Sequence, residues 1–271
     1  MNNLTMFCLS MNPKHYNFIR EVDYVPVGLG KNNFSKEWLR DNLGQNISEK
    51  NKHYGEYTFH YWLWKNYLNK VKEGWIGFCQ YRKFWSTEKN NLLPDSLDHL
   101  RLLILKEIPD SYQDFDAILG DQYFINQFKL MKFLKGGFKL IVKKPLYLFN
   151  KNKRNIKFHF DLMHGYNNLN KAIELLDSND RDDFNNFVNT KVSFNPHNMF
   201  MCKSKQILQD YYAVIFPWLE RCEKEFGFEN LSGFGQIRIY TFLAERFMSY
   251  WFQKNTKYKT MPIVFFDIGK K

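Results

Sequence analysis

Residues 46–85 constrain the fold of this chain more than any other segment. They begin with a polar cap, continue as a long aromatic helix pattern, and end in the apolar run 75–79, which the cluster Gln-Tyr-Arg-Lys at 80–83 follows directly. Open α/β sheets build ligand sites in this way, with polar groups at the carboxyl ends of buried strands. Because the delivered charge is positive, the segment favours a phosphate-bearing ligand over a carboxylate-bound metal. A solvated strand end is the alternative.

Short apolar runs alternate with helical patterns along the rest of the chain. We expect strands at residues 5–10, 23–27, 75–79, 117–119 and 199–202. We expect helices at residues 50–71, 94–107, 169–176, 183–188, 204–226 and 237–252, with Pro217 kinking the fifth. This alternation predicts an α/β fold with a mostly parallel sheet and C-terminal helices, in one domain over residues 1–271.

The composition excludes several classes of protein. A chain of 271 residues with 44% hydrophobic and 18% aromatic residues can fill a large core. No run approaches the roughly 18 apolar residues that span a bilayer, and the N-terminus lacks a signal-peptide pattern, so we expect a cytoplasmic location. The four cysteines are far apart and form no CxxC pair, which argues against a structural zinc site.

The net charge of +11 is concentrated in one segment. Residues 122–160 contain ten Lys or Arg and no Asp or Glu, so the other residues together carry only +1. Aromatic residues are interleaved with these lysines, which predicts a basic aromatic insertion that lies on an anionic membrane surface, on the inner face of the plasma membrane. Nucleic-acid binding and an inert loop are the alternatives, and the chain has no recognisable nucleic-acid motif.

Four polar residues share one side of the helix expected at 50–71 and its cap. Glu49, His53, Glu56 and His60 are spaced by four, three and four residues. Such a set could hold a metal, as in a metal-dependent hydrolase, but no matching second helix and no HExxH motif accompany it. Lining of a polar site, or a solvated helix face, is the favoured interpretation.

Two other places combine polar residues that could meet a ligand. His197 and Asn198 precede the strand expected at 199–202, where side chains can converge on a substrate, and His164 lies in a second polar stretch. Arg238 lies on the last helix with Glu245 and Arg246, at a spacing for which a structural ion pair is favoured.

These motifs resemble a bacterial family first catalogued as a domain of unknown function and linked to capsule and lipopolysaccharide glycosyltransferases. The resemblance is carried by residues 46–51 (NISEKN), 56–58 (EYT), 61–66 (YWLWKN), 77–83 (GFCQYRK), 198–201 (NMFM) and 244–247 (AERF). This chain departs from the family pattern at three positions, where Gln80 replaces His, Lys83 replaces Arg and Gln45 replaces Asp.

The resemblance implies a fold similar to the Rossmann-like type-A glycosyltransferases and a nucleotide-sugar donor. That class usually carries an Asp-x-Asp pair after a central strand to hold a divalent metal. Here no acidic pair follows residues 75–79, and the spacing of Asp114 and Asp116 precedes a strand instead. We therefore expect cations to replace the metal, with no obligatory cofactor, although Mn²⁺ or Mg²⁺ is possible.

On this interpretation we predict the following roles for the site residues. Glu56 or Glu49 would be the general base and Arg82 would stabilise the leaving diphosphate. The donor would contact Asn46, Asn51, Lys65, Tyr81, Arg82 and Lys83. The acceptor would contact His164, His197, Asn198 and Arg238. The donor would be a UDP-sugar, with galactose or galactofuranose, and the acceptor a lipid-linked or growing cell-surface glycan. A non-catalytic membrane-surface or nucleic-acid binding module is the alternative.

Overall fold

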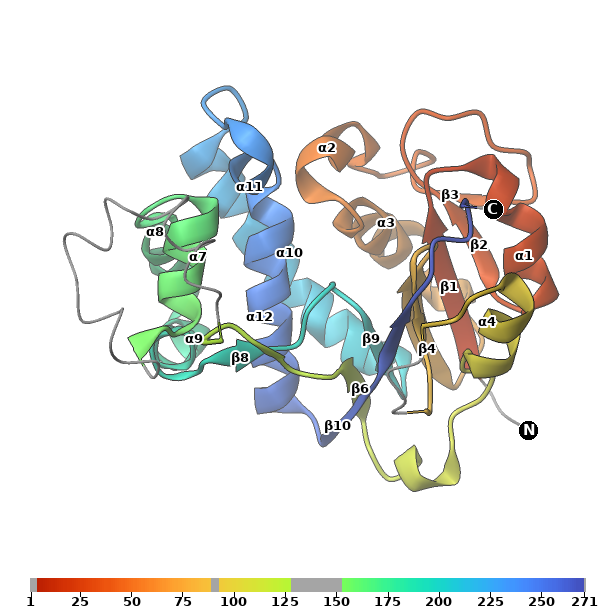
Figure 1. Ribbon diagram of the computed structural model, residues 1–271. Coiled ribbons are helices and arrows are strands. Elements are labelled where there is room, and N and C mark those ends of the chain that lie inside the picture. Colours follow the sequence, from red (N-terminus) through yellow and green to blue (C-terminus); the bar gives the residue numbers. More distant parts are fainter. Residues whose placement is uncertain (1–3, 89–92, 128–152, 271) are drawn as a thin grey trace.

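A mixed sheet with helices on both faces forms the centre of the molecule (Figure 1). The computed structural model describes residues 4–88, 93–127 and 153–270. The strands of the sheet run in the order β10-β6-β9-β4-β1-β2-β3, with β5 and β11 paired beside β4. Their bounds are β1 (Leu4–Ser10), β2 (Val25–Gly28), β3 (Leu39–Arg40), β4 (Trp75–Gln80), β5 (Lys83–Trp85), β6 (Ala117–Gly120), β9 (Phe200–Cys202), β10 (Tyr258–Met261) and β11 (Ile263–Phe265). A separate pair joins β7 (Tyr123–Phe124) to β8 (Ser193–Phe194).

The predicted mostly parallel sheet is confirmed. Strand β1 is parallel to both β2 and β4, β2 is parallel to β3, and β6 is parallel to β10. Strand β9 runs antiparallel between β4 and β6, and the short pair β5–β11 is also antiparallel. The carboxyl ends of β1, β2 and β4 therefore meet at one edge of the sheet, where open α/β sheets bind ligands.

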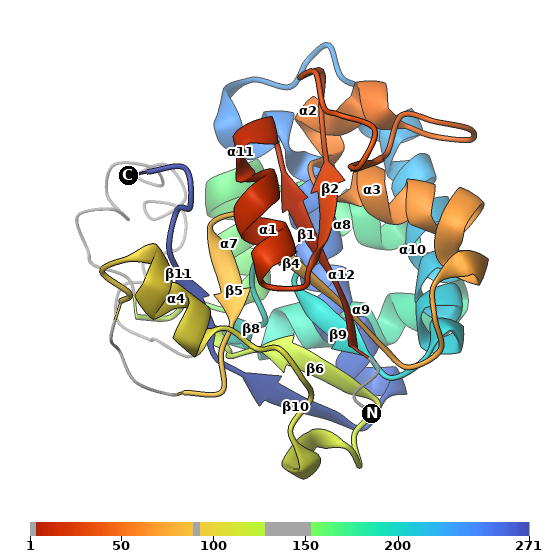
Figure 2. The same ribbon diagram turned by 90° about the vertical axis from the view of Figure 1, so that its right-hand side faces the viewer.

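Helices cover both faces of the sheet (Figures 1 and 2). Their bounds are α1 (Tyr16–Glu21), α2 (Asn51–Tyr54), α3 (Tyr57–Trp62), α4 (Leu97–Leu103), α7 (Ile156–His164), α8 (Asn168–Glu174), α9 (Ser178–Thr190), α10 (Lys205–Phe226), α11 (Gly233–Ile237) and α12 (Ile239–Asn255). Helix α10 continues through Pro217. None of the helices within the described ranges is long and apolar enough to cross a membrane.

Alternating side chains along the strands divide the core into two parts. Phe7 of β1 and Phe78 of β4 point to the face covered by α3, α10 and α12. Their neighbours Cys8 and Cys79 point to the opposite face, against α1, α4 and the aromatic side chains of β5. Both faces of the central strands are thus buried, which explains why these strands are apolar runs and show no alternation with polar residues.

The prediction of a single helix at 50–71 is wrong, because the helix is interrupted at Gly55. Helix α2 ends there with Gly55 at φ +55°, and α3 begins two residues later. A Cβ at Gly55 would lie 2.5 Å from the Arg238 guanidinium and 2.9 Å from the Thr241 hydroxyl. Only glycine fits this conformation and this space. After Trp62 the chain continues as a π-helical turn and a 3₁₀ turn (Leu63–Tyr67 and Leu68–Lys70).

The break disperses the four polar residues that a continuous helix would have aligned. Glu49 is exposed and pairs with Lys31, whereas His60 is fully buried and hydrogen-bonded through Nδ1 to the Tyr212 hydroxyl. The described residues hold no group of three or more His, Cys, Asp or Glu side chains placed to bind a metal. The basic insertion predicted at 122–160 lies mostly outside the described residues, since 128–152 are not described.

Candidate functional site

A polar pocket of about 320 Å³ lies at the carboxyl edge of β1 and β4. Five segments far apart in the sequence meet there: the end of β1, the end of β4, the break between α2 and α3, the turn before β9, and α12. The residues around the pocket are Leu9, Ser10, Met11, Leu29, Asn51, Gly55, Glu56, Gln80, Tyr81, Arg82, Lys83, His197, Asn198, Phe234, Arg238, Thr241, Phe242 and Glu245. We call this space the cationic pocket.

Three cations reach the cationic pocket. Arg82 and Lys83 follow β4, and Arg238 precedes α12 from the opposite side. The Arg82 guanidinium lies over the Tyr81 ring, 4.8 Å from its centroid, and Lys83 Nζ donates to Gln80 Oε1 at 3.3 Å. Burial lowers the pKa of Lys83, while the carboxylates of Glu56 and Glu245 act in the opposite direction. The pocket therefore presents a concentrated positive charge to a ligand.

Two carboxylates balance part of this charge. Glu56 Oε1 accepts a hydrogen bond from Asn198 Nδ2 at 2.9 Å, and its Oε2 lies 3.6 Å from Arg238 Nη2. Glu245 Oε1 accepts from the His197 backbone N–H at 2.5 Å, and its other oxygen pairs with Arg246. Burial raises the pKa of Glu245, and the charge of Arg246 partly opposes the rise.

The turn before β9 has an unusual backbone. His197 and Asn198 both have positive φ, at 78° and 52°. Each such non-glycine conformation costs about 1–3 kcal/mol and persists only where the surroundings hold it. Here Gln80 Nε2 donates to the His197 carbonyl at 3.1 Å, and Asn198 Nδ2 also contacts the Thr241 carbonyl at 3.3 Å. Asn198 Oδ1 is buried without a partner among the described residues, so it can accept a hydrogen bond from a ligand.

A buried cation supports the carboxylate of Glu245 from behind. Arg246 is only 2% exposed, and its guanidinium lies 4.1 Å from the Phe194 ring centroid. Its Nη2 contacts His159 Nδ1 at 3.2 Å and His164 Nε2 at 3.5 Å. Burial, with a further contribution from the charge of Arg246, lowers the pKa of His159 to about 3. Both imidazoles are therefore neutral, which lets them accept from the guanidinium.

Most of the predicted site residues converge on the cationic pocket. Its lining includes the predicted donor residues Asn51, Tyr81, Arg82 and Lys83, the predicted base Glu56, and the predicted acceptor residues His197, Asn198 and Arg238. Family motifs contained Asn51, Glu56, Tyr81, Arg82, Lys83 and Asn198. His197 was predicted from its place before a strand, and Arg238 from its place on the last helix.

Four predicted site residues lie away from this pocket. Glu49 has a side chain that is 82% exposed, and Asn46 is engaged within its own loop, where its side chain accepts from Ser48. Lys65 Nζ lies 3.3 Å from the Trp64 ring centroid. His164 is buried behind Phe242, at 3.9 Å between ring centroids, and its Nδ1 donates to the Gly235 carbonyl. The geometry gives these four residues supporting positions and no place in the lining.

Glu245 is the residue that sequence reasoning undervalued. The spacing of Arg238, Glu245 and Arg246 indicated a structural ion pair. In the structure Glu245 pairs with Arg246, while Arg238 lies against Glu56. The Glu245 carboxylate also lines the cationic pocket and holds the His197 turn. The family motif AERF at 244–247 contained the signal, but a spacing rule does not tell whether a paired carboxylate also faces a cavity.

The donor set at the end of β4 does not fit a divalent metal. Gln80, Tyr81, Arg82 and Lys83 supply cations and neutral groups, whereas Mg²⁺ and Mn²⁺ prefer carboxylate oxygens. The two carboxylates of the pocket already face Arg238 and Arg246. Asp116, in the Asp-x-Asp spacing upstream of β6, accepts from the Lys257 backbone N–H and so supports the start of β10.

Comparisons with known proteins place this geometry in context. The structure is similar to that of a protein described as "WbbM bifunctional glycosytransferase apo structure", with a TM-score of 0.69 and 18% sequence identity. The alignment covers 97% of this chain and 45% of that chain, so this chain spans less than half the length of its neighbour. The two share a fold. A comparison with curated proteins gave no match.

The sequence itself matches a known family. The profile described as "Domain of unknown function (DUF4422)" aligns with residues 8–256, which include every residue of the cationic pocket and all strands of the sheet except β10, β11 and the start of β1. The chain therefore belongs to the DUF4422 family.

Proposed function

We propose that this protein is a glycosyltransferase that moves a sugar from a nucleotide donor to a glycan acceptor. The observation that carries the proposal is the meeting of Arg82, Lys83 and Arg238 with Glu56 in one pocket at the carboxyl edge of β1 and β4. Departure of a nucleoside diphosphate requires positive charge where negative charge develops, and a preorganised set of cations supplies it. The fold shared with a protein described as a glycosyltransferase supports the same function.

The residues of the pocket have complementary roles in the proposed reaction. An acceptor hydroxyl attacks the anomeric carbon of the donor while the bond from that carbon to the phosphate oxygen breaks. Glu56 takes the proton of the hydroxyl. Arg82 binds the departing diphosphate through two parallel hydrogen bonds, and Lys83 and Arg238 add charge beside it. Asn198, which donates to Glu56, orients the base.

The finer assignments belong to the same proposal. The donor is a UDP-sugar, with galactose or galactofuranose as the sugar, and the transfer requires no divalent metal because the cations occupy its place. The acceptor is a lipid-linked or growing cell-surface polysaccharide of the capsule or lipopolysaccharide type. The enzyme works on the cytoplasmic face of the plasma membrane without spanning it, and the basic aromatic residues at 122–160 bind anionic lipid.

Ligand binding measured by thermal shift tests the proposal. The protein is titrated with UDP, UDP-galactose and other nucleotides, each in the presence of EDTA or of manganese. Stabilisation by UDP that persists in EDTA, and that Arg82→Ala removes, is the expected result. Stabilisation that appears only with manganese contradicts the metal-independent assignment. Tight, salt-sensitive binding to oligonucleotides or anionic vesicles without any nucleotide effect would replace the transferase with a binding module.

A further inference from the structure

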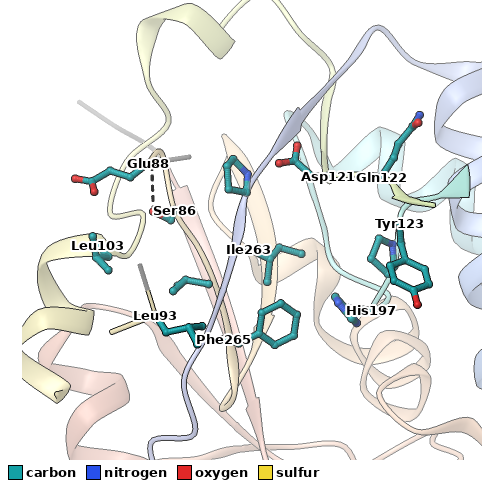
Figure 3. Close-up of a pocket in the computed structure, with 13 residues that line it drawn as sticks. Ser86, Glu88, Leu93, Leu103, Asp121, Gln122, Tyr123, His197, Ile263 and Phe265 are labelled. Carbon is teal, nitrogen blue, oxygen red and sulfur yellow. Dashed lines mark hydrogen bonds between the residues drawn. The ribbon is translucent and has the colours of Figure 1, made fainter. Parts of the chain in front are cut away.

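A second and larger cavity, of about 690 Å³, adjoins the cationic pocket (Figure 3). It is surrounded by residues that follow β5, by β11, by the segment that joins β6 to β7, and by the Pro196–His197 turn. We call it the aromatic pocket, after the exposed rings of Tyr123 and Phe265. In the view of Figure 3, His197 lies between these two rings, while Glu88 and Leu103 lie on the far side of Phe265.

A thin wall separates the two pockets. Phe265 of β11 is directly opposite Lys83 of β5 in the antiparallel pair, so their side chains leave the same face of the sheet. Lys83 lines the cationic pocket and Phe265 lines the aromatic pocket. The His197 ring lies 5.3 Å from the Phe265 ring and borders both spaces. A ligand in the aromatic pocket therefore lies beside the group that faces the donor diphosphate in the proposed reaction.

The lining of the aromatic pocket has the chemistry of a carbohydrate site. Tyr123 is 52% exposed and Phe265 is 46% exposed, and both rings line the same cavity. Flat apolar rings can pack against the C–H faces of a sugar. Glu88, Asp121 and Gln122 place carboxylate and amide oxygens around them, which accept hydrogen bonds from sugar hydroxyls. Burial lowers the pKa of His197 to about 3, so its imidazole is neutral and able to accept as well as donate.

The charge of the lining selects among ligands. The described residues that surround the aromatic pocket include two carboxylates and neither Lys nor Arg. Within the described lining, a diphosphate or an anionic lipid headgroup would face these two carboxylates and no Lys or Arg, whereas Arg82, Lys83 and Arg238 line the cationic pocket. A neutral polyhydroxylated chain fits this lining, and the volume of the aromatic pocket exceeds that of the cationic pocket.

We propose that the aromatic pocket binds a neutral oligosaccharide, the non-reducing end of the acceptor glycan, with Tyr123 and Phe265 as stacking platforms and Glu88 and Asp121 as hydroxyl acceptors. This inference rests on the proposed glycosyltransferase function. It assigns the acceptor to the side of His197 opposite the cations, so that the terminal hydroxyl reaches Glu56 past the His197–Asn198 turn.

Glycan binding can be measured apart from catalysis. The full chain is applied to an array of immobilised neutral oligosaccharides with galactose, glucose, mannose, rhamnose or N-acetylglucosamine termini, and UDP binding is measured in parallel by calorimetry. The double variant Tyr123→Ala/Phe265→Ala is compared with Tyr166→Ala, which removes an aromatic ring that is 65% exposed and lines neither pocket. Asp121→Asn is a third variant, which keeps the shape and removes the charge.

Binding to at least one class of glycan is expected for the unmodified protein. The double variant should lower that binding by roughly tenfold or more while UDP affinity is unchanged, because each ring contributes contact area and no contact to the diphosphate. Tyr166→Ala should leave both unchanged. Asp121→Asn should weaken glycan binding and leave UDP affinity unchanged.

Two results would overturn the assignment. One is the absence of glycan binding by the unmodified protein, and the other is glycan binding that the double variant and Tyr166→Ala retain equally. If the unmodified protein binds phosphatidylcholine vesicles but no glycan, and the double variant loses the affinity for vesicles, the rings bind a lipid chain instead. If glycan binds as expected and UDP does not, the donor half of the proposed function fails and the aromatic pocket stands as a glycan site.

Discussion

The cationic pocket and the aromatic pocket share the His197 turn but hold their side chains in different ways. In the cationic pocket Glu56, Glu245 and Lys83 each have a named polar partner, and the backbone turn beside them is strained. In the aromatic pocket Tyr123 and Phe265 are about half exposed. Charges that act on a transition state must be fixed in advance, since reorganisation costs energy at the moment of reaction. Aromatic rings that pack against a sugar need a complementary shape and no fixed charge.

Replacing the base should produce the largest effect and test whether chemistry belongs to the cationic pocket. Glu56→Gln keeps the hydrogen bond from Asn198 and removes proton acceptance, so kcat should fall by about 10²–10⁴-fold while UDP affinity changes little. Initial rates of UDP release with donor and acceptor provide the measurement. Glu245→Gln is the matched variant. A larger loss of kcat in Glu245→Gln than in Glu56→Gln would transfer the role of base to Glu245.

Removing the guanidinium of Arg82 should have the next largest effect on the rate. Arg82→Ala should lower kcat by about 10²-fold and weaken UDP binding, because the charge that receives the diphosphate is lost. Arg82→Lys should recover part of the rate, since it retains the charge without the bidentate geometry. Arg101→Ala is the control. It removes an arginine of α4 that pairs with Asp98 on the same helix and with Glu21 on α1, and it should have the rate of the unmodified protein. Equal rates in Arg82→Ala and Arg101→Ala would contradict the assignment.

Strands β1, β2, β4, β6 and β9 could be predicted from the sequence because they are buried on both faces, whereas the less buried strands β5, β10 and β11 were not expected. Residues 75–79 and 117–119 are nearly continuous apolar runs, and the structure has β4 and β6 there. The two-residue strands β3, β7 and β8 were not expected, because so short a segment has no period to detect. Helix α7 at Ile156–His164 was assigned to the basic insertion, since lysines and histidines obscure its apolar side.

The candidate site was predicted residue by residue but not as a geometry. Family motifs identified Glu56, Arg82 and Asn198, the helix pattern added Arg238, and all four line one pocket. The helix break was missed because Gly55 lies in an otherwise helical pattern, where a lone glycine costs only about 1 kcal/mol. What requires the break is the close approach of Arg238, 183 positions later in the chain, and local patterns carry no information about such contacts.

Substitution of that glycine tests how much the cationic pocket depends on the break. Gly55→Ala should lower the free energy of unfolding by about 2–3 kcal/mol, through a disallowed φ and a collision with Arg238. Gly227→Ala has a similar backbone, with φ 60° and ψ −156°, but open space around the added methyl, so it should cost less because only the backbone strain is added. Chemical denaturation measures both.

The collision also predicts a functional difference between these variants. Displacement of Arg238 should weaken UDP binding in Gly55→Ala and not in Gly227→Ala, while glycan binding in the aromatic pocket should persist in both. Equal destabilisation by the two substitutions, with UDP affinity intact, would show that Arg238 moves aside freely and that the break has no role in the pocket.

The smallest expected effect concerns His197, which belongs to both pockets. Its pKa is lowered to about 3 by burial and, secondarily, by Lys83, against 6.5 for an ordinary histidine. The unfolded chain therefore binds a proton first as pH falls below 6.5, so His197 stabilises the fold fully above that pH and progressively less down to about pH 3. Between pH 7 and 6 its contribution should decrease by under about 1 kcal/mol. The buried His60 and His159 act in the same direction, whereas the raised pKa of Glu245 acts oppositely.

His197→Asn separates this contribution from the others. Asparagine tolerates positive φ, so the turn is retained while the titrating group is removed. Denaturation curves at pH 7 and pH 6 should show a smaller loss of stability in the variant than in the unmodified protein. Identical losses would mean that the imidazole reaches solvent and titrates equally in the folded and unfolded states. In that case the wall between the two pockets is open to water, and the separation of a charged donor side from a neutral acceptor side would rest on the side chains of Lys83 and Phe265 alone.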